Sequence, residues 1–155
     1  MSQNLETKIV ALSERPSLAF GVAGWLKQTF RYLDETLLME ITVRLLVSGA
    51  TFEESFVMLE NDVPVGTASL AAHDLASRPD LGPWISNVYV LPAYRRRGYA
   101  SALIRHIEAF ARTQAISTLW LYTLDAVALY ERLGWHRAGL ARDKYFTVVL
   151  MRRDL

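Results

Sequence analysis

One segment constrains the fold more than any other part of the chain. It runs from Val88 to Phe110 and reads VYVLPAYRRRGYASALIRHIEAF. Val88 and Val90 alternate with Tyr89 as in a strand, and Pro92 then removes a backbone donor from any ladder. Apolar residues next recur at helical spacing, at Ala100, Leu103, Ile104, Ile107, Phe110 and Ala111. The segment therefore predicts a strand, a turn that contains three arginines, and an amphipathic helix.

The turn between this strand and this helix has the properties of an anion site. The first N–H groups of a helix lack intrahelical partners and carry the positive end of the helix dipole. Gly98 allows a ligand to approach the backbone closely, so Arg95 to Ala100 form a candidate phosphate cradle. A solvated basic loop is the alternative. Neither G-x-x-x-x-G-K-[ST] nor G-x-G-x-x-G is present in the chain.

The rest of the chain predicts alternating helices and strands. Two early helices are expected, one over Leu18–Leu33 and a second that Asp34 caps and that extends to Leu46. Two β-rich runs flank Asn61 and Asp62, which predicts a hairpin. With 155 residues and 52% hydrophobic content, we expect one domain that covers residues 1–155.

Charge and cysteine content exclude several classes of protein. The formal net charge is +1, so the arginine cluster is a local feature and general binding to nucleic acid is disfavoured. The absence of cysteine excludes disulfides, thiolate metal sites and a cysteine nucleophile, and the histidines and acids show no metal-ligand spacing. The first residues do not resemble a signal peptide, and no apolar run is long enough to span a bilayer. We therefore expect a soluble, cytoplasmic protein with neither a metal nor a membrane partner.

The arginine-containing turn resembles the acyl-CoA-binding motif of the GNAT superfamily of N-acetyltransferases. That motif, R/Q-x-x-G-x-G/A, is matched by Arg95, Gly98 and Ala100, and the preceding V-x-V-x-P is typical of the family's fourth strand. Downstream, LWLYTLDAVALYERLGWHRAG resembles the family's fifth strand and the helix after it. Its pattern A-x-x-L-Y-x-x-x-G-F/W is matched at Ala126, Leu129, Tyr130, Gly134 and Trp135. The resemblance covers the C-terminal two-thirds of the chain, and the N-terminal third follows the family only in element order.

The resemblance implies an α/β (α+β) fold and acetyl-CoA as cosubstrate. A mixed, mostly antiparallel sheet is flanked by helices, and its fourth and fifth strands splay apart to admit the pantetheine arm. By this analogy the arginines are counter-charges, and Thr123 stands where many members have an asparagine that bonds pantetheine. The implied acetyl-CoA contacts are Val88, Tyr89, Val90, Arg95, Arg96, Arg97, Gly98, Tyr99, Ala100, Ser101 and Thr123.

The chemistry needs a proton donor for the leaving thiolate and a base for the attacking amine. Tyr130 is the candidate general acid because the resemblance aligns it with the tyrosine that faces the CoA sulfur, although a core aromatic is the alternative interpretation. The strand over Ile85–Val90 contains no carboxylate. The general base therefore stays open among His73, Asp74, Asp80 and a water relay.

The resemblance implies that the acceptor is a primary amine, of either a small molecule or a peptide N-terminus. In this family the early helices and the loop from His73 to Trp84 line the acceptor side. They offer Tyr32, Glu35, Asp74, Asp80 and Trp84. An idle acyl-CoA-binding sensor is a second hypothesis, and a nucleic-acid-binding domain that uses Arg95, Arg96, Arg97, Arg105 and Arg112 is a third. Many relatives are dimers, so a homodimer is one candidate assembly.

Overall fold

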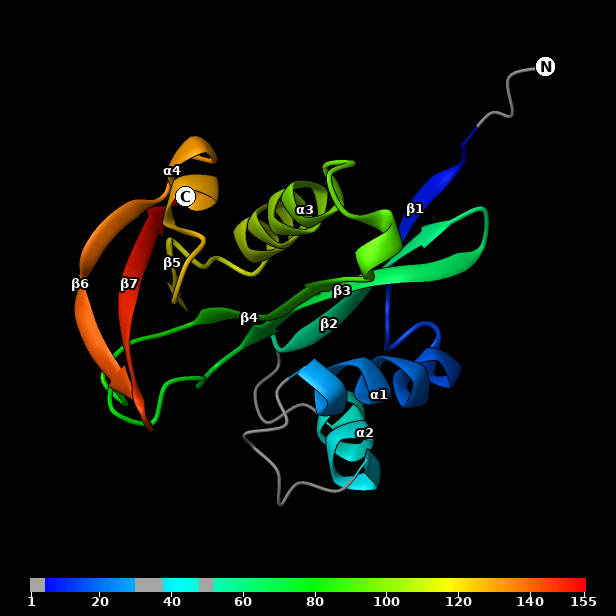
Figure 1. Ribbon diagram of the computed structural model, residues 1–155, viewed down its shortest axis with the longest axis horizontal. Coiled ribbons are helices and arrows are strands. Elements are labelled where there is room, and N and C mark those ends of the chain that lie inside the picture. Colours follow the sequence, from blue (N-terminus) through cyan, green and yellow to red (C-terminus); the bar gives the residue numbers. More distant parts are fainter. Residues whose placement is uncertain (1–4, 30–37, 48–51) are drawn as a thin grey trace.

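The computed structural model describes residues 5–29, 38–47 and 52–155, and within them the chain forms one seven-stranded sheet (Figure 1). The strand order is β1-β2-β3-β4-β5-β7-β6, and every neighbouring pair is antiparallel except β4 and β5. The strands are β1 (Thr7–Ala11), β2 (Glu54–Glu60), β3 (Val63–Ala71), β4 (Trp84–Val90), β5 (Thr118–Thr123), β6 (His136–Asp143) and β7 (Phe146–Asp154).

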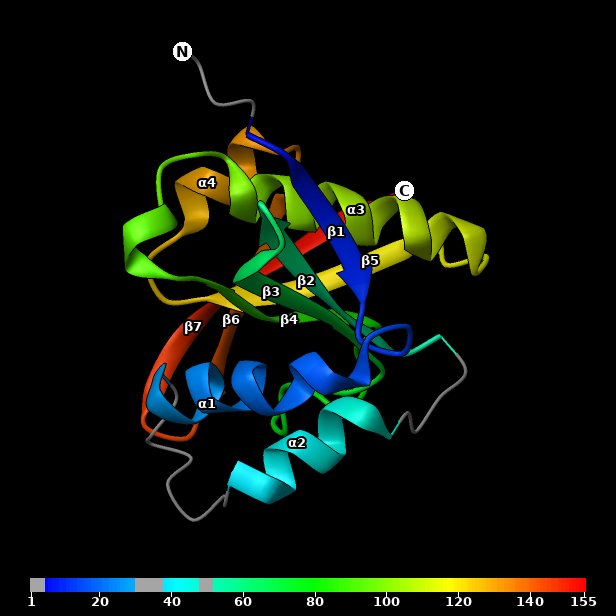
Figure 2. The same ribbon diagram turned by 90° about the vertical axis from the view of Figure 1, so that its right-hand side faces the viewer.

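Helices cover both faces of this sheet, as Figures 1 and 2 show. They are α1 (Ala19–Thr29), α2 (Leu38–Leu46), α3 (Tyr99–Thr113) and α4 (Val127–Arg132), with short 3₁₀ turns at Pro16–Leu18 and Pro92–Tyr94. The helices α3 and α4 lie on one face, and α1 and α2 on the other. The apolar stripe of α3, including Leu103, Ile104 and Ile107, is fully buried against the sheet. Burial of this stripe positions the N-terminus of α3 at the end of β4.

The sequence-based elements agree with these ranges where the chain is described. The hairpin turn is formed by Asn61 and Asp62, both with positive φ (50° and 65°), as a tight type I′ connection between β2 and β3 requires. The helix expected over Leu18–Leu33 is α1, and the second expected helix is α2. Residues 30–33 of that first prediction, and the cap at Asp34, lie outside the described residues.

The parallel strands β4 and β5 part almost as soon as they meet. Among the described residues, Trp84 and Trp120 are their one pair in register, and the Trp120 amide donates to the Pro83 carbonyl at 3.0 Å. On its other edge β4 contains a bulge, because Thr67 pairs with Tyr89 but Ser69 pairs with Ser86. Beyond Trp84 the edge of β4 that faces β5 is therefore left without a ladder partner.

The mixed sheet with helices on both faces and splayed fourth and fifth strands confirms the predicted fold class. The assignment of residues 1–155 to a single domain stays a prediction.

Candidate functional site

The candidate phosphate cradle lies where α3 begins. Gly98 is the N-cap of α3 with a φ of 80°, and Arg96 before it has a φ of 64°. The first helical hydrogen bond is donated by the Ala102 amide to the Gly98 carbonyl at 2.9 Å. The amides of residues 99–101 therefore precede the intrahelical ladder. A Cβ at Gly98 would meet no heavy atom within 4 Å, so this backbone faces open space. The arrangement fits a bound diphosphate.

The three arginines of this turn have different roles in the structure. Arg95 donates from Nε to the Val90 carbonyl at 2.8 Å, and its guanidinium lies 5.6 Å from the centre of the Tyr89 ring. Arg96 is exposed and makes no hydrogen bond or ion pair with any residue that the structure describes. Its side chain is therefore available to a ligand, whereas that of Arg95 already braces the turn.

Arg97 is held by a glutamate that sequence reasoning did not find. Its Nη1 donates to Glu60 Oε1 at 2.7 Å, and the Tyr99 hydroxyl donates to the same oxygen. Glu60 lies at the end of β2 and is 8% exposed, while Arg97 also lies 5.1 Å from the centre of the Tyr94 ring. Glu60 precedes Arg97 by 37 positions, so no local sequence pattern links the two residues. They meet because β2, β3 and β4 pair side by side in the sheet.

Across the opening from β4 lies β5, and α4 follows β5 in the chain. Tyr130 of α4 is 7% exposed and packs edge-on against Trp135, with ring centres 6.3 Å apart. Burial raises the pKa of Tyr130 to about 12, so its phenol keeps a proton at neutral pH. At the end of β5, Thr123 Oγ1 accepts a hydrogen bond from the Ala126 amide at 3.0 Å, which leaves the hydroxyl proton free to donate elsewhere.

The base candidates lie in the loop between β3 and β4. His73 and Asp74 are both exposed residues. Enough protein surrounds the Asp74 carboxyl group that desolvation, followed by the negative charge of Asp143, raises its pKa to about 7. Leu75 is buried with Trp84 at the point where β4 and β5 part. Asp74 therefore directly precedes a residue that packs with Trp84, and its raised pKa lies in the range that a base needs.

Two other residues of this loop have structural partners instead. Asp80 accepts from Arg78 Nε at 3.0 Å and Nη2 at 2.8 Å, and this bonding lowers the pKa of Asp80. Trp84 is fully buried and donates from Nε1 to the Leu81 carbonyl at 3.0 Å. The Trp84 ring, which the sequence offers to the acceptor side, packs in a core cluster with Leu75, Val148 and Leu150.

The remaining sequence candidates do not add a second site. Tyr32 and Glu35 lie outside the described residues. His106 packs edge-on against Phe56 at 4.8 Å, and burial lowers the pKa of its imidazole, as expected of a structural histidine. Over residues 5–29, 38–47 and 52–155, no group of three His, Cys, Asp or Glu side chains could hold a metal ion. Over the same ranges, no helix combines the length and apolar character needed to cross a bilayer.

Comparison with known proteins identifies the class to which this fold and this site belong. The sequence profile described as the acetyltransferase (GNAT) family matches residues 20–135. The chain belongs to this family of acetyl-CoA-dependent N-acyltransferases, which confirms the assignment made from the two motifs.

Curated relatives and solved structures agree with this membership. The ribosomal protein bS18 alanine N-acetyltransferase of Escherichia coli (strain K12) is 37% identical over 65 residues, which are 39% of this chain and 44% of that protein. The match therefore spans less than half of the relative's length. A GNAT-family acetyltransferase from Streptococcus pneumoniae superposes with a TM-score of 0.72 at 18% identity, over 97% of this chain and 100% of the other. An aminoglycoside 6′-N-acetyltransferase complexed with coenzyme A superposes with a TM-score of 0.75 at 14% identity, over 95% of this chain and 96% of the other.

The raised pKa of Asp74 predicts a pH-dependent cost to stability. Its carboxyl group holds a proton up to about pH 7 in the folded chain but only to about 3.8 in the unfolded chain, so stability falls as pH rises between these values. Asp74→Asn removes the charge, and we expect it to melt at a higher temperature than the parent at pH 8, with a smaller difference at pH 4. Thermal unfolding followed by circular dichroism at both pH values measures this.

Asp80→Asn is the matched control, because it makes the same change in the same loop at a carboxylate whose pKa is lowered by Arg78. It should not raise the melting temperature at pH 8. Equal melting temperatures for Asp74→Asn and the parent at both pH values would contradict the interpretation.

Proposed function

We propose that this chain is an N-acetyltransferase that moves an acetyl group from acetyl-CoA to a primary amine by direct attack in a ternary complex. The observation that carries the proposal is the opening between β4 and β5, which begins after the Trp84–Trp120 pair. The anion cradle lies where the chain continues from β4 into α3, and a buried, protonated tyrosine follows β5. The family uses acetyl-CoA, and these features fit it.

The proposed contacts with acetyl-CoA use mainly backbone groups. The part of β4 over Val88, Tyr89 and Val90, which lacks a ladder partner on the β5 side, would hydrogen-bond the pantetheine amides as a neighbouring strand does. The Val90 carbonyl there also accepts from Arg95 Nε. The amides from Gly98 to Ser101, with the side chain of Arg96, would hold the diphosphate. Arg95 and Arg97 stabilise this loop through their hydrogen bonds to the Val90 carbonyl and to Glu60. Thr123, at the end of β5, would donate its hydroxyl proton to the pantetheine arm.

The proposed proton transfers use two groups whose pKa values are both shifted. Asp74, in its ionised form, takes a proton from the acceptor ammonium, directly or through one water, so that the nitrogen lone pair can attack the thioester carbon. The carbon–sulfur bond then breaks, and Tyr130 gives its proton to the sulfur. His73, the residue before Asp74 in the same exposed loop, is the second base candidate.

The acceptor that we propose to test first is a peptide with an N-terminal alanine. The curated relative acts on the alanine of ribosomal protein bS18, and an aminoglycoside 6′-N-acetyltransferase shares the fold. Small cationic amines are therefore the second group to test. A cytoplasmic location and a homodimeric assembly are further parts of the proposal. Sedimentation of the purified protein measures whether it is a monomer or a dimer. A non-catalytic acyl-CoA sensor is the alternative, and it requires binding without turnover.

The cradle predicts acetyl-CoA binding that depends on Gly98. We expect calorimetry to give micromolar affinity, on the order of −8 kcal/mol, and Gly98→Asp to abolish it, since a carboxylate would occupy the anion position at a φ of 80°. Gly21→Asp is the control, because Gly21 also faces open space but lies in α1. The absence of binding by the parent chain would refute both the enzyme and the sensor.

The proton donor is tested by Tyr130→Phe. This change keeps the ring and its packing against Trp135 but removes the proton, so kcat should fall about 10- to 1000-fold while acetyl-CoA affinity stays within about twofold. The measurement is steady-state release of CoA with an accepted amine. A mutant that turns over at the parental rate, with chemistry shown to limit that rate, would make Tyr130 a core aromatic only.

The base predicts the pH profile. Because Asp74 accepts a proton only when ionised, kcat/KM should rise with pH through about 7 and level off above it. Asp74→Asn should lower kcat/KM and remove this inflection. The neighbouring control His73→Gln should keep the parental kcat/KM and the inflection near pH 7. If Asp74→Asn leaves the profile intact, another group or water must take the proton.

A further inference from the structure

A buried carboxylate on α3 is not explained by the site described above. Glu108 is 1% exposed, while its neighbours on the same helix face, Ile104, Ile107 and Ala111, belong to the apolar core. An ionised carboxylate in such a place is costly unless nearby cations and donors compensate it. Its partners therefore show what the charge is used for.

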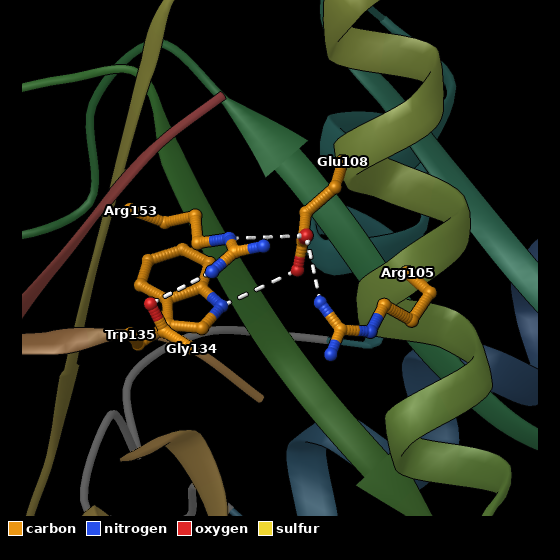
Figure 3. Close-up of polar contacts among 5 residues, drawn as sticks. All are labelled: Arg105, Glu108, Gly134, Trp135 and Arg153. Carbon is orange, nitrogen blue, oxygen red and sulfur yellow. Dashed lines mark hydrogen bonds and ion pairs between the residues drawn. The ribbon is translucent and has the colours of Figure 1, made fainter. Parts of the chain in front are cut away.

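Three side chains converge on Glu108 from three parts of the chain (Figure 3). The Trp135 indole Nε1 donates to Oε2 at 3.3 Å, and Arg105 Nη1 donates to Oε1 at 3.2 Å. Arg153 of β7 places its Nε 3.4 Å from Oε1. That Nε is buried and makes no hydrogen bond within the described part of the chain, so the charge of Glu108 is what compensates it.

Arg153 also fixes the turn that follows α4. Its Nη1 donates to the Gly134 carbonyl at 2.8 Å. Gly134 has a φ of 93°, and a Cβ there would lie 1.9 Å from Arg153 Nη1. Only a glycine leaves room for this contact, so the guanidinium and the turn are complementary in shape. Glu108 and Arg153 thus hold the two consecutive residues Gly134 and Trp135.

These two residues are attached directly to Tyr130. The Trp135 amide donates to the Tyr130 carbonyl at 3.0 Å, and the two rings pack edge to face at 64°. The helix α4 has only six residues, and a helix this short depends on tertiary contacts to hold its orientation. The place of the Tyr130 phenol therefore depends on where Trp135 and Gly134 are held.

We infer that Glu108, acting with Arg153, is a positioning residue that sets the orientation of Tyr130 for proton transfer. The inference rests on the proposed role of Tyr130 as general acid. Glu108 does not touch the reacting atoms; it acts through the Trp135 indole, and through Arg153 on the Gly134 carbonyl. Because the cradle forms the N-terminus of the same helix α3, one rigid element sets both the diphosphate contact and the tyrosine.

The first test is spectroscopic and needs no acceptor. In protein labelled with [ζ-¹³C]tyrosine, the Tyr130 signal is assigned by its loss in Tyr130→Phe. Glu108→Gln keeps the size of the side chain but removes the charge that compensates Arg153, so we expect the Tyr130 signal to shift or broaden as Trp135 moves. Glu131→Gln is the matched control, because Glu131 forms only a surface ion pair with Arg137 near the same turn. It should leave the signal in place.

The second test measures turnover of the accepted amine, with a peptide bearing N-terminal alanine tried first. Glu108→Gln should lower kcat about 10-fold or more with little change in KM for acetyl-CoA. The same substitution in a Tyr130→Phe background should have almost no further effect, since the residue through which it acts has lost its proton. Arg153→Lys keeps a positive charge but cannot reach both Glu108 and Gly134, and it replaces Glu108→Gln in both tests if that variant does not fold.

The outcomes separate this inference from the proposed function. A folded Glu108→Gln with an unmoved Tyr130 signal, or with the same loss of kcat in both backgrounds, overturns the positioning role. A Tyr130→Phe variant with unchanged kcat instead removes the general acid itself.

Discussion

The parting of two parallel strands is the constraint on which the rest of this structure depends. Backbone N–H and C=O groups need partners, and a buried strand edge without them is unfavourable. Between β4 and β5 the backbone groups find partners at the Trp84–Trp120 pair, and the pairing ends there. The edge beyond that pair is open to an extended ligand with amides of its own. The helix α3 places its free amides at the end of that same strand, so the two sets of unpaired groups are continuous.

Two buried glutamates hold the helix that begins at this opening. Near the N-terminus of α3, Glu60 from β2 binds Arg97 and Tyr99. Further along α3, Glu108 binds Trp135 and Arg153. Both carboxylates join segments that are distant in the chain. Burial makes each of these charges costly unless its partners compensate it, so each carboxylate fixes the positions of the groups that it binds.

The loop between β3 and β4 contains one aspartate whose charge is disfavoured and one whose charge is paired. Asp74 is desolvated and repelled by Asp143, which disfavours its ionised form in the folded chain. A residue that lowers stability at neutral pH is easier to explain by its chemistry than by its packing. Asp80, six positions later, is paired with Arg78 and has the usual surface role. The two aspartates look alike in the sequence, and only their surroundings distinguish them.

The local sequence determined the elements of this protein and the place of its candidate cofactor site. The strand–turn–helix of residues 88–110 and the hairpin at Asn61 and Asp62 follow from residue periodicity and turn chemistry, which act over a few positions. The helix bearing Tyr130 was expected from the resemblance of its motif to the family's. The tertiary structure alone decided which arginine is free, which aspartate titrates near neutrality and why Glu108 is buried. Each of these depends on a partner far along the chain, such as Glu60 for Arg97 and Arg153 for Glu108. Periodicity contains no information about such pairs, because they form only when sheet pairing and helix packing bring the segments together.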